Sequence, residues 1–256
     1  MTSSDLGRSR CRVDLVETGI RFQDGSVVGW DVLGQIGGEE RRVYWIQDGE
    51  ARPVQTFSEK TGWVRVLCAT STAPTVLVSG IPMHRIKDTD PIADTESKIT
   101  ALGRPKGRVL DTATGLGYTA IFAARSASEV VTIELDPAAI EIARWNPWSA
   151  ELFERGNIRQ IVGDAVEEIG ALPSASFGAV IHDPPTITLG GDLYSEDLYR
   201  QIHRVMKRGG RLFHYIGDPD SGIGKRLYPG VMNRLSQAGF HGTTRHKTAF
   251  GVTAIA

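Results

Sequence analysis

The chain has 256 residues, of which 41% are hydrophobic and 23% are charged, and its formal net charge is −1. These values are ordinary for a globular protein with a sizeable core, built as one large domain or one domain with a small addition. They exclude a bilayer-spanning run of roughly 18 apolar residues and a global basic field that would attract nucleic acid. Cys11 and Cys68 lack metal-ligand spacing. We therefore expect a cytoplasmic protein with a small-molecule partner, no membrane association and no metal site.

The first part of the chain, residues 1–95, is predicted to form a small β-rich domain with a linker. Short runs rich in β-branched residues alternate with turns, and Asp-Gly pairs stand at 24–25 and 48–49. Asp-Gly between such runs is typical of β-hairpins. We expect strands within the segments 13–22, 26–36, 41–47, 51–57, 63–70 and 75–81.

The second part, residues 96–256, alternates strands with helices, and this order indicates a parallel sheet covered on both faces. The last two strands are close enough to form a hairpin, so at least one of them is antiparallel. The predicted fold class is α/β, with a Rossmann-like, doubly wound, mostly parallel seven-stranded sheet. Strands are expected at 107–114, 129–136, 157–165, 177–185, 211–217, 242–249 and 251–256, and helices at 118–127, 137–145, 195–208 and 224–238.

A glycine loop with the sequence DTATGLGYTA, at 111–120, joins the first strand and helix of this part. Gly115, Gly117 and Ala120 fit the G-x-G-x-x-A pattern, in which small residues let the backbone approach a ligand at the end of a strand. Dinucleotide-binding enzymes have this pattern, and a plain tight turn between strand and helix also fits it. The loop alone therefore leaves the ligand open.

Acidic residues end four successive predicted strands: Asp111, Glu134, Asp164 and Asp183. In an open parallel sheet these ends line one crevice, where ligands bind. Asp111 would gain nothing beside a pyrophosphate, but it suits the ammonium or sulfonium of S-adenosylmethionine. Glu134 suits a ribose diol, and Asp164 suits either an adenine amino group or a cap on the next helix. The four positions together favour S-adenosylmethionine as the cofactor.

At these residues the chain, from about 108 to 256, resembles class I S-adenosylmethionine-dependent methyltransferases. The matching features are the glycine loop, the acid after the second strand, Gly163-Asp164, the Asp-Pro-Pro at 183–185, Gly209-Gly210 and the closing hairpin. The segments LDTATGLGYTAI, NPWSAELF, VIHDPP and SGIPMHRIKDTDPIADTESKI narrow the resemblance, over residues 76–256, to predicted methyltransferases best known from archaea. That group is distantly similar to spermidine synthases. Ala113 departs from the general pattern, which has a glycine there.

The resemblance implies a cofactor site and a place for the chemistry. The methionine part would lie at the loop, the ribose at Glu134 and the adenine near Asp164. Three residues are candidates for catalysis: Asp183, stiffened by the two prolines that follow it, His84 in the polar segment 79–98, and Tyr215 at the end of the fifth strand. Cofactor contacts are expected from Asp111, Ala113, Gly115, Gly117, Glu134, Leu135, Gly163, Asp164, Ala165 and Asp183.

Thr186 stands where enzymes that methylate the amino groups of bases have an aromatic ring after the prolines. Because threonine cannot stack on a base, we expect methyl transfer to a small amine or similar nucleophile. The alternative on the same fold is aminopropyl or 3-amino-3-carboxypropyl transfer, or cyclisation, releasing methylthioadenosine. A nicotinamide-dependent oxidoreductase and a non-catalytic binding protein are the other readings. A homodimer stays open.

Overall fold

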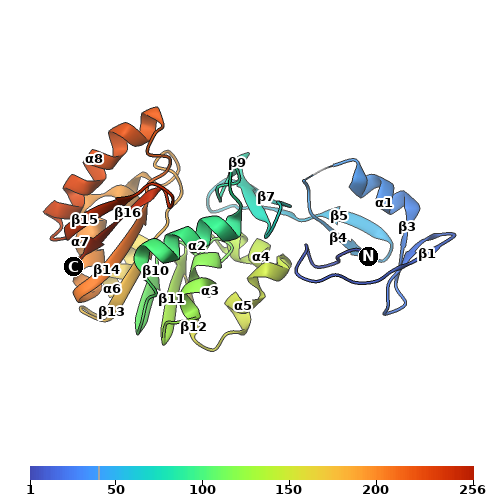
Figure 1. The fold of residues 1–256 in the computed structure, drawn as a ribbon, viewed down its shortest axis with the longest axis horizontal. Coiled ribbons are helices and arrows are strands. Elements are labelled where there is room, and N and C mark those ends of the chain that lie inside the picture. The colour runs from blue at the N-terminus through green and yellow to red at the C-terminus, as the bar shows by residue number, and fades with distance from the viewer. Residues whose placement is uncertain (40) are drawn as a thin grey trace. The chain divides into compact units, whose positions relative to one another are not determined.

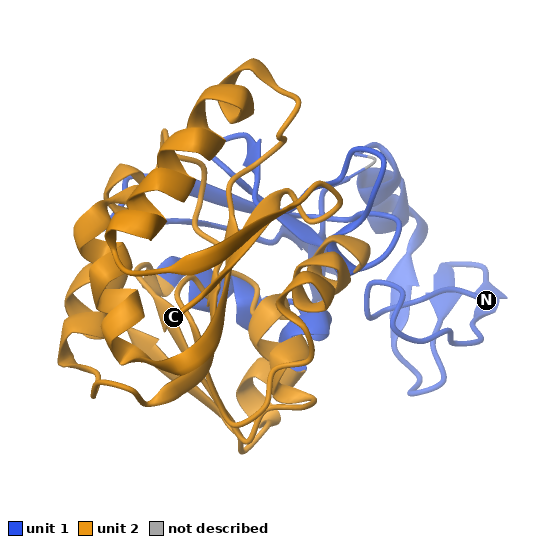
Figure 2. Ribbon diagram, turned by 60° about the vertical axis from the view of Figure 1, so that its left-hand side comes forward, with its two compact units in different colours: residues 1–92, 138–150 blue, residues 93–137, 151–256 orange. Residues whose placement is uncertain are grey.

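The computed structural model describes residues 1–39 and 41–256. These residues form two compact units (Figure 2): the first comprises residues 1–92 and 138–150, and the second comprises residues 93–137 and 151–256. Among the described residues, no helix has both the length and the apolar character needed to cross a membrane.

The second unit is built on a seven-stranded sheet with the strand order β12-β11-β10-β13-β14-β16-β15. The pairs among β10 to β14 are parallel, whereas β16 pairs antiparallel with both β14 and β15. The predicted Rossmann-like sheet with its closing hairpin is therefore confirmed. The strands are β10 (Arg108–Asp111), β11 (Glu129–Glu134), β12 (Ile158–Val162), β13 (Phe177–His182), β14 (Met206–Tyr215), β15 (His241–His246) and β16 (Gly251–Ile255).

Helices cover both faces of this sheet (Figure 1). Leu110 on β10 belongs to a hydrophobic core shared with α6, α7 and α8, whereas its neighbour Val109 is equally buried on the other face, because successive side chains of a strand point to opposite sides. The helices of this unit are α2 (Pro91–Leu102, which begins at the end of the first unit), α3 (Tyr118–Ala124), α5 (Ala150–Glu154), α6 (Ala165–Ala171), α7 (Glu196–Val205) and α8 (Gly222–Gln237), with a 3₁₀ turn η2 (Gly191–Tyr194).

The first unit contains small antiparallel sheets with the orders β1-β2-β3, β4-β5 and β6-β7-β8-β9. Residues 138–150 join it through tryptophans: the ring centroids of Trp45 and Trp145 are 4.3 Å apart, and Trp148 Nε1 donates to Leu6 O at 2.9 Å. The elements are β1 (Asp14–Val16), β2 (Gly19–Arg21), β3 (Val27–Gly29), α1 (Trp30–Gly37), β4 (Tyr44–Gln47), β5 (Glu50–Pro53), β6 (Gln55–Phe57), β7 (Val64–Cys68), β8 (Thr75–Val78), β9 (Ile81–Pro82), α4 (Pro137–Trp145) and η1 (Pro147–Ser149).

The structure differs most clearly from the sequence prediction at three places. The strand expected at 26–36 ends at Gly29 and continues as α1, in which Val32 alone is buried and Asp31 stands in the first turn, a position that favours a helix start. The segment 79–98 contains the start of α2, which the sequence prediction lacked. The helix expected to reach residue 208 ends at Val205, and its last predicted residues begin β14.

Candidate active site

The four strand-end acids lie along one edge of the sheet. Asp111 and Glu134 are the last residues of β10 and β11, Asp183 directly follows β13, and Asp164 follows β12 by two residues. These four strands are parallel neighbours in the order β12-β11-β10-β13, so their carboxyl ends share an edge. The structure thus brings together the candidates that the sequence had placed on separate strands.

Asp111 is a fully buried carboxyl group with one satisfied oxygen. Its Oδ2 accepts hydrogen bonds from Thr132 Oγ1 at 2.9 Å and Thr119 Oγ1 at 3.3 Å, whereas Oδ1 has no hydrogen-bond partner among the described residues. Burial raises the pKa of Asp111 to about 8, against the lowering effect of the Thr132 hydroxyl. At neutral pH this carboxyl group is therefore mostly protonated unless a cation is brought to it.

Glu134 fixes the glycine loop at the neighbouring strand end. Its Oε2 accepts the N–H of Gly115 at 2.8 Å, and its Oε1 accepts the N–H of Asp136 at 3.0 Å. These two hydrogen bonds hold the Glu134 carboxylate at the end of β11, beside the glycine loop. Gly117 is required as glycine: its φ is +79°, and an added Cβ would lie 2.7 Å from Leu152 Cδ2. Ala113 in the same loop is half-buried.

Beyond Glu134, the edge of the sheet carries exposed apolar side chains. Leu135 is 37% exposed and Val166 is 39% exposed, which offers apolar surface for a flat ring. Asp164 caps α6, because its side chain accepts the N–H of Val166 at 2.8 Å. The capping role that the sequence left open is therefore observed, and contact of Asp164 with adenine stays a prediction. Gly163 and Ala165 flank it, with Gly163 half-buried and Ala165 buried.

Asp183 is held by a buried lysine that the sequence analysis missed. Lys98 Nζ on α2 lies 2.6 Å from Asp183 Oδ2 and 2.9 Å from Asp94 Oδ2. The same ammonium lies 4.5 Å from the ring centroid of Tyr215 at the end of β14. Two of the three catalytic candidates, Asp183 and Tyr215, are thus brought together around Lys98. The spacing of Asp94 and Lys98, four residues apart on one helix, was the available signal.

Charge pairing opposes burial in this cluster. Burial acts to lower the pKa of Lys98, but Asp183 and Asp94 outweigh it and raise that pKa above its ordinary value. Burial raises the pKa of Asp183 above its ordinary value, and the Lys98 ammonium offsets this rise only in part. Lys98 is therefore a permanent cation, and it favours the ionised form of the carboxyl group beside it.

The residues around Asp183 give the loop a fixed backbone. In the strand just before it, His182 is buried, and its Nε2 donates to Leu193 O at 2.8 Å while its Nδ1 accepts from Thr112 Oγ1 at 2.6 Å. In the loop after it, Tyr194 Oη donates to Pro185 O at 3.1 Å. Burial lowers the pKa of His182 to about 4, so the ring is neutral. A neutral ring keeps the donor and acceptor roles that these partners need.

Other predicted residues have local partners. His84 Nδ1 lies 3.1 Å from Thr75 Oγ1 within the first unit, and its part in catalysis stays a prediction. Asp90 begins α2: its Oδ1 accepts the N–H of Ile92 at 2.9 Å, with proline at the first helical position. Thr186 is exposed and shares a hydrogen bond with Thr188 at 2.9 Å.

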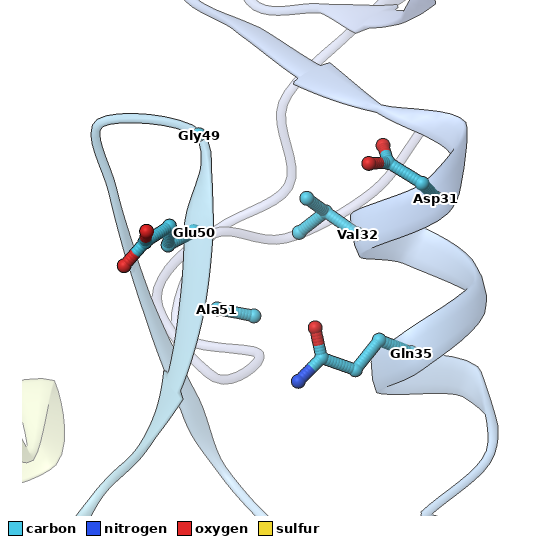
Figure 3. A pocket seen from close by; sticks show the side chains of 6 residues that line it. All are labelled: Asp31, Val32, Gln35, Gly49, Glu50 and Ala51. Atoms are coloured by element: carbon cyan, nitrogen blue, oxygen red, sulfur yellow. The ribbon is translucent and has the colours of Figure 1, made fainter.

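The first unit has a hollow of its own (Figure 3). It has a volume of about 430 Å³ and lies between α1 and β5. Asp31 and Glu50 are its only charged lining residues, and both are exposed. It contains none of the strand-end acids, so we do not assign the chemistry to it. Among the described residues, no group of three or more His, Cys, Asp or Glu side chains is placed to hold a metal ion.

The strand-end site fits S-adenosylmethionine by the chemistry of its donor set. The orphaned Oδ1 of Asp111 is a buried acceptor without a cation, and an ammonium or sulfonium would satisfy it. The Glu134 carboxylate at the neighbouring strand end is an acceptor of the kind that suits ribose hydroxyls, and Leu135 offers apolar surface beside it.

Several known proteins resemble this chain in sequence. Residues 109–210 match the family described as a methyltransferase domain. Protein MJ1233 of Methanocaldococcus jannaschii is 44% identical over 237 residues, which is 92% of this chain and 80% of that protein. Polyamine aminopropyltransferase 2 of Streptomyces coelicolor is 33% identical over 129 residues, 47% of this chain and 23% of that enzyme. The chain thus spans about a quarter of that relative.

Solved structures share the fold. A spermidine synthase in complex with the transition-state analogue AdoDATO has a TM-score of 0.65 and 19% identity, covering 79% of this chain and 72% of that one. Spermidine synthase from Thermotoga maritima has a TM-score of 0.62 and 16% identity, covering 88% and 83%. At these identities the likeness concerns the fold alone.

Proposed function

We propose that this chain, which belongs to the same family as protein MJ1233 and is an S-adenosylmethionine-dependent transferase, moves a methyl group to the nitrogen of a small-molecule amine. The observation that carries the proposal is the pair of carboxyl groups at adjacent strand ends, one fully buried and one partly exposed. Asp111 has an unsatisfied oxygen for a cationic ligand, and Asp183 is accessible at the end of the next strand, with 16% of its side chain exposed.

The residues of the second unit divide the work. Asp111 would hold the cationic part of the cofactor, Glu134 the ribose, and Leu135 the adenine face. When bound, the sulfonium supplies an electrophilic methyl carbon whose bonding electron pair to sulfur leaves with the sulfur. Asp183 accepts the proton that the amine nitrogen loses as the new carbon–nitrogen bond forms. A fixed carboxylate suits this task, because transfer in line requires positioning and a deprotonated nucleophile.

A second candidate function is aminopropyl or 3-amino-3-carboxypropyl transfer, or cyclisation, from the same sulfonium or its decarboxylated form. The observation that favours it is the 33% identity with a polyamine aminopropyltransferase over 129 residues, 47% of this chain. Attack on a different carbon beside the same sulfur needs only a shifted nucleophile, so both proposals use the same carboxylates.

Identification of the nucleoside by-product by mass decides between the two. The protein is incubated with S-adenosylmethionine or its decarboxylated form and a panel of small amines. S-adenosylhomocysteine is expected for methyl transfer, and methylthioadenosine would replace it for the second function. The Asp183→Asn variant is expected to lose turnover while still binding the cofactor, whereas Asp220→Asn, at an exposed loop position, serves as the matched control. Full turnover by Asp183→Asn would overturn the role given to this carboxylate.

A further inference from the structure

Lys98 is a buried cation whose surroundings are almost entirely anionic or aromatic. The side chains of Lys98 and Asp94 are 4% and 0% exposed, and that of Asp183 is 16% exposed. A lysine is rarely placed at such a depth unless it is paired. Here the ammonium contacts both carboxyl groups and faces the Tyr215 ring. The three side chains of Asp94, Lys98 and Asp183 form one buried cluster, called the lysine cluster below.

The two oxygens of Asp183 are unequal because of this cluster. Oδ2 accepts a hydrogen bond from Lys98 Nζ at 2.6 Å. Oδ1 has no hydrogen-bond partner among the described residues. Asp183 is also the most exposed member of the lysine cluster. An incoming nucleophile therefore meets Asp183 through Oδ1.

Asp94 is the second carboxyl group in contact with the Lys98 ammonium. The Asp94 carboxyl group forms a second ion pair with the same ammonium, with its Oδ2 2.9 Å from Lys98 Nζ. The cost of removing a charge from water is high, so a buried ammonium stays in place only where its partners are well arranged. With Asp94 on α2 and Asp183 after β13, the lysine joins that helix to the loop that carries the reacting carboxylate.

We propose that Lys98 is a positioning residue for the transfer reaction: it fixes the Asp183 carboxylate through Oδ2, favours its ionised form, and leaves Oδ1 as the single acceptor for one N–H of the nucleophile. This inference rests on the proposed function, in which Asp183 receives the proton of the amine. It adds a role for a residue of α2 that touches neither the cofactor residues Asp111 and Glu134 nor the nucleophile.

The charge state of Asp183 depends on groups from several elements. The cation Lys98 favours the carboxylate, and Asp94 on the same helix opposes it. Asp111 on β10 and Tyr194 in η2 are also electrostatically coupled to Asp183, and Tyr215 on β14 faces the lysine. Since Lys98 is the nearest charge, its removal is expected to have the largest effect.

The test is a carbon-13 NMR titration of the Asp183 carboxyl group in the full chain, which requires no acceptor. The signal is assigned by its loss in Asp183→Asn. In Lys98→Met, the pKa of Asp183 is expected to rise by roughly 1–3 units, because an opposite charge at contact distance is removed. In Asp94→Asn, where the lysine remains, the same pKa is expected to fall. Lys207→Met removes an exposed lysine and should leave the titration unchanged.

The direction of these shifts separates positioning from a merely structural role. If Lys98 only held the fold together, its loss would open the cluster to water, and the pKa of Asp183 would fall toward its ordinary value of 3.8. That fall in a folded Lys98→Met protein would overturn the proposal. If Lys98→Met does not fold, Asp94→Asn decides, since an unchanged or raised pKa of Asp183 in that variant would overturn it equally.

Calorimetry with S-adenosylmethionine keeps this inference separate from the proposed function. Wild type and Lys98→Met are expected to bind the cofactor with similar affinity, because the lysine touches neither Asp111 nor Glu134. Absence of binding to the wild type, whether S-adenosylmethionine or its decarboxylated form is offered, would refute the proposed function while the titration still reports on Lys98. A normal affinity combined with a fallen Asp183 pKa would refute the role of Lys98 alone.

Discussion

Asp111 and Asp183 end neighbouring strands of one sheet, yet their carboxyl groups are stabilised in opposite ways. Asp183 has an internal counter-ion, since Lys98 Nζ lies 2.6 Å away. Asp111 has only threonine hydroxyls, and its second oxygen lacks a partner among the described residues. Asp183 therefore has a counter-ion within the protein, whereas Asp111 has none among the described residues.

This difference assigns the two carboxyl groups to two tasks. A group that gains its counter-ion from a ligand couples ligand binding to its own ionisation. A group that carries its own counter-ion keeps the same charge with and without ligand, which suits a proton acceptor in each turnover. On this account the cofactor binds at Asp111 and the nucleophile reacts at Asp183.

Removal of Lys98, the internal counter-ion of Asp183, should have the largest effect, which is a loss of stability. Lys98→Met leaves Asp94 and Asp183 buried without a cation, and the expected loss of stability is about 3–5 kcal/mol. Urea unfolding measures it. Lys207→Met, at an exposed position, should change stability by less than about 0.5 kcal/mol. An equally small change in Lys98→Met would mean that the lysine cluster does not carry the energy ascribed to it.

His182, the last residue of β13, makes the stability of the fold depend on pH in the acid range. Its pKa is about 4 in the folded protein and 6.5 ordinarily, so between these values the unfolded chain binds more protons and stability falls as the pH falls. Across that window the wild type should lose about 3 kcal/mol relative to His182→Gln, which does not titrate. Unfolding of both proteins at pH 7 and pH 4 tests this, and parallel losses would contradict it.

Removal of the Asp111 carboxyl group should affect ligand binding more than the stability of the fold. Asp111→Asn keeps the size of the side chain but loses its charge, and a hydrogen bond to a charged group contributes about 1.5–3 kcal/mol. At pH 8 the affinity for S-adenosylmethionine is expected to fall roughly 10- to 100-fold. The exposed Asp220→Asn variant is the control in the same calorimetric titration. A wild-type affinity in Asp111→Asn would place the cation elsewhere.

Substitutions of Asp164 have the smallest expected effect, and they distinguish its two roles, helix capping and adenine binding. Asp164→Asn keeps the cap on α6, because asparagine also accepts the helix N–H, whereas Asp164→Ala loses it and should cost about 1 kcal/mol of stability. If Asp164 also binds adenine, both variants should weaken cofactor binding. Unchanged affinity in Asp164→Asn would leave capping as the whole role of this residue.

The strand-end acids could be predicted from sequence because alternating strands and helices fix the direction of each strand. Once β10 to β13 are parallel, Asp111, Glu134 and Asp183 must share an edge. The partner of Asp183 could not be predicted in that way, because Lys98 is contributed by a helix before the sheet, and helix packing is not encoded in strand order.

Local signals explain the remaining differences. Asp90 followed by Pro91 marks the start of α2, and Asp94 with Lys98 marks its charged side, although the sequence prediction contained no helix in the polar segment 79–98. The segment 26–36 is predicted as a strand because β-branched residues follow an Asp-Gly pair, but its second half forms α1, in which Val32 alone is buried. The hydroxyl pairing that leaves Asp111 Oδ1 free depends on three-dimensional distances that no spacing in the sequence reveals.

The central claim is that Asp111 becomes ionised when it receives the cationic cofactor, and calorimetric titration with S-adenosylmethionine across pH tests it most directly. Because the pKa of Asp111 is about 8 without ligand, wild-type affinity should rise roughly tenfold per pH unit up to that value, with about one proton released per site when buffers of different ionisation heat are compared. Asp111→Asn should lack both the release and this slope. Wild-type affinity independent of pH between 6 and 8, without proton release, would contradict the account.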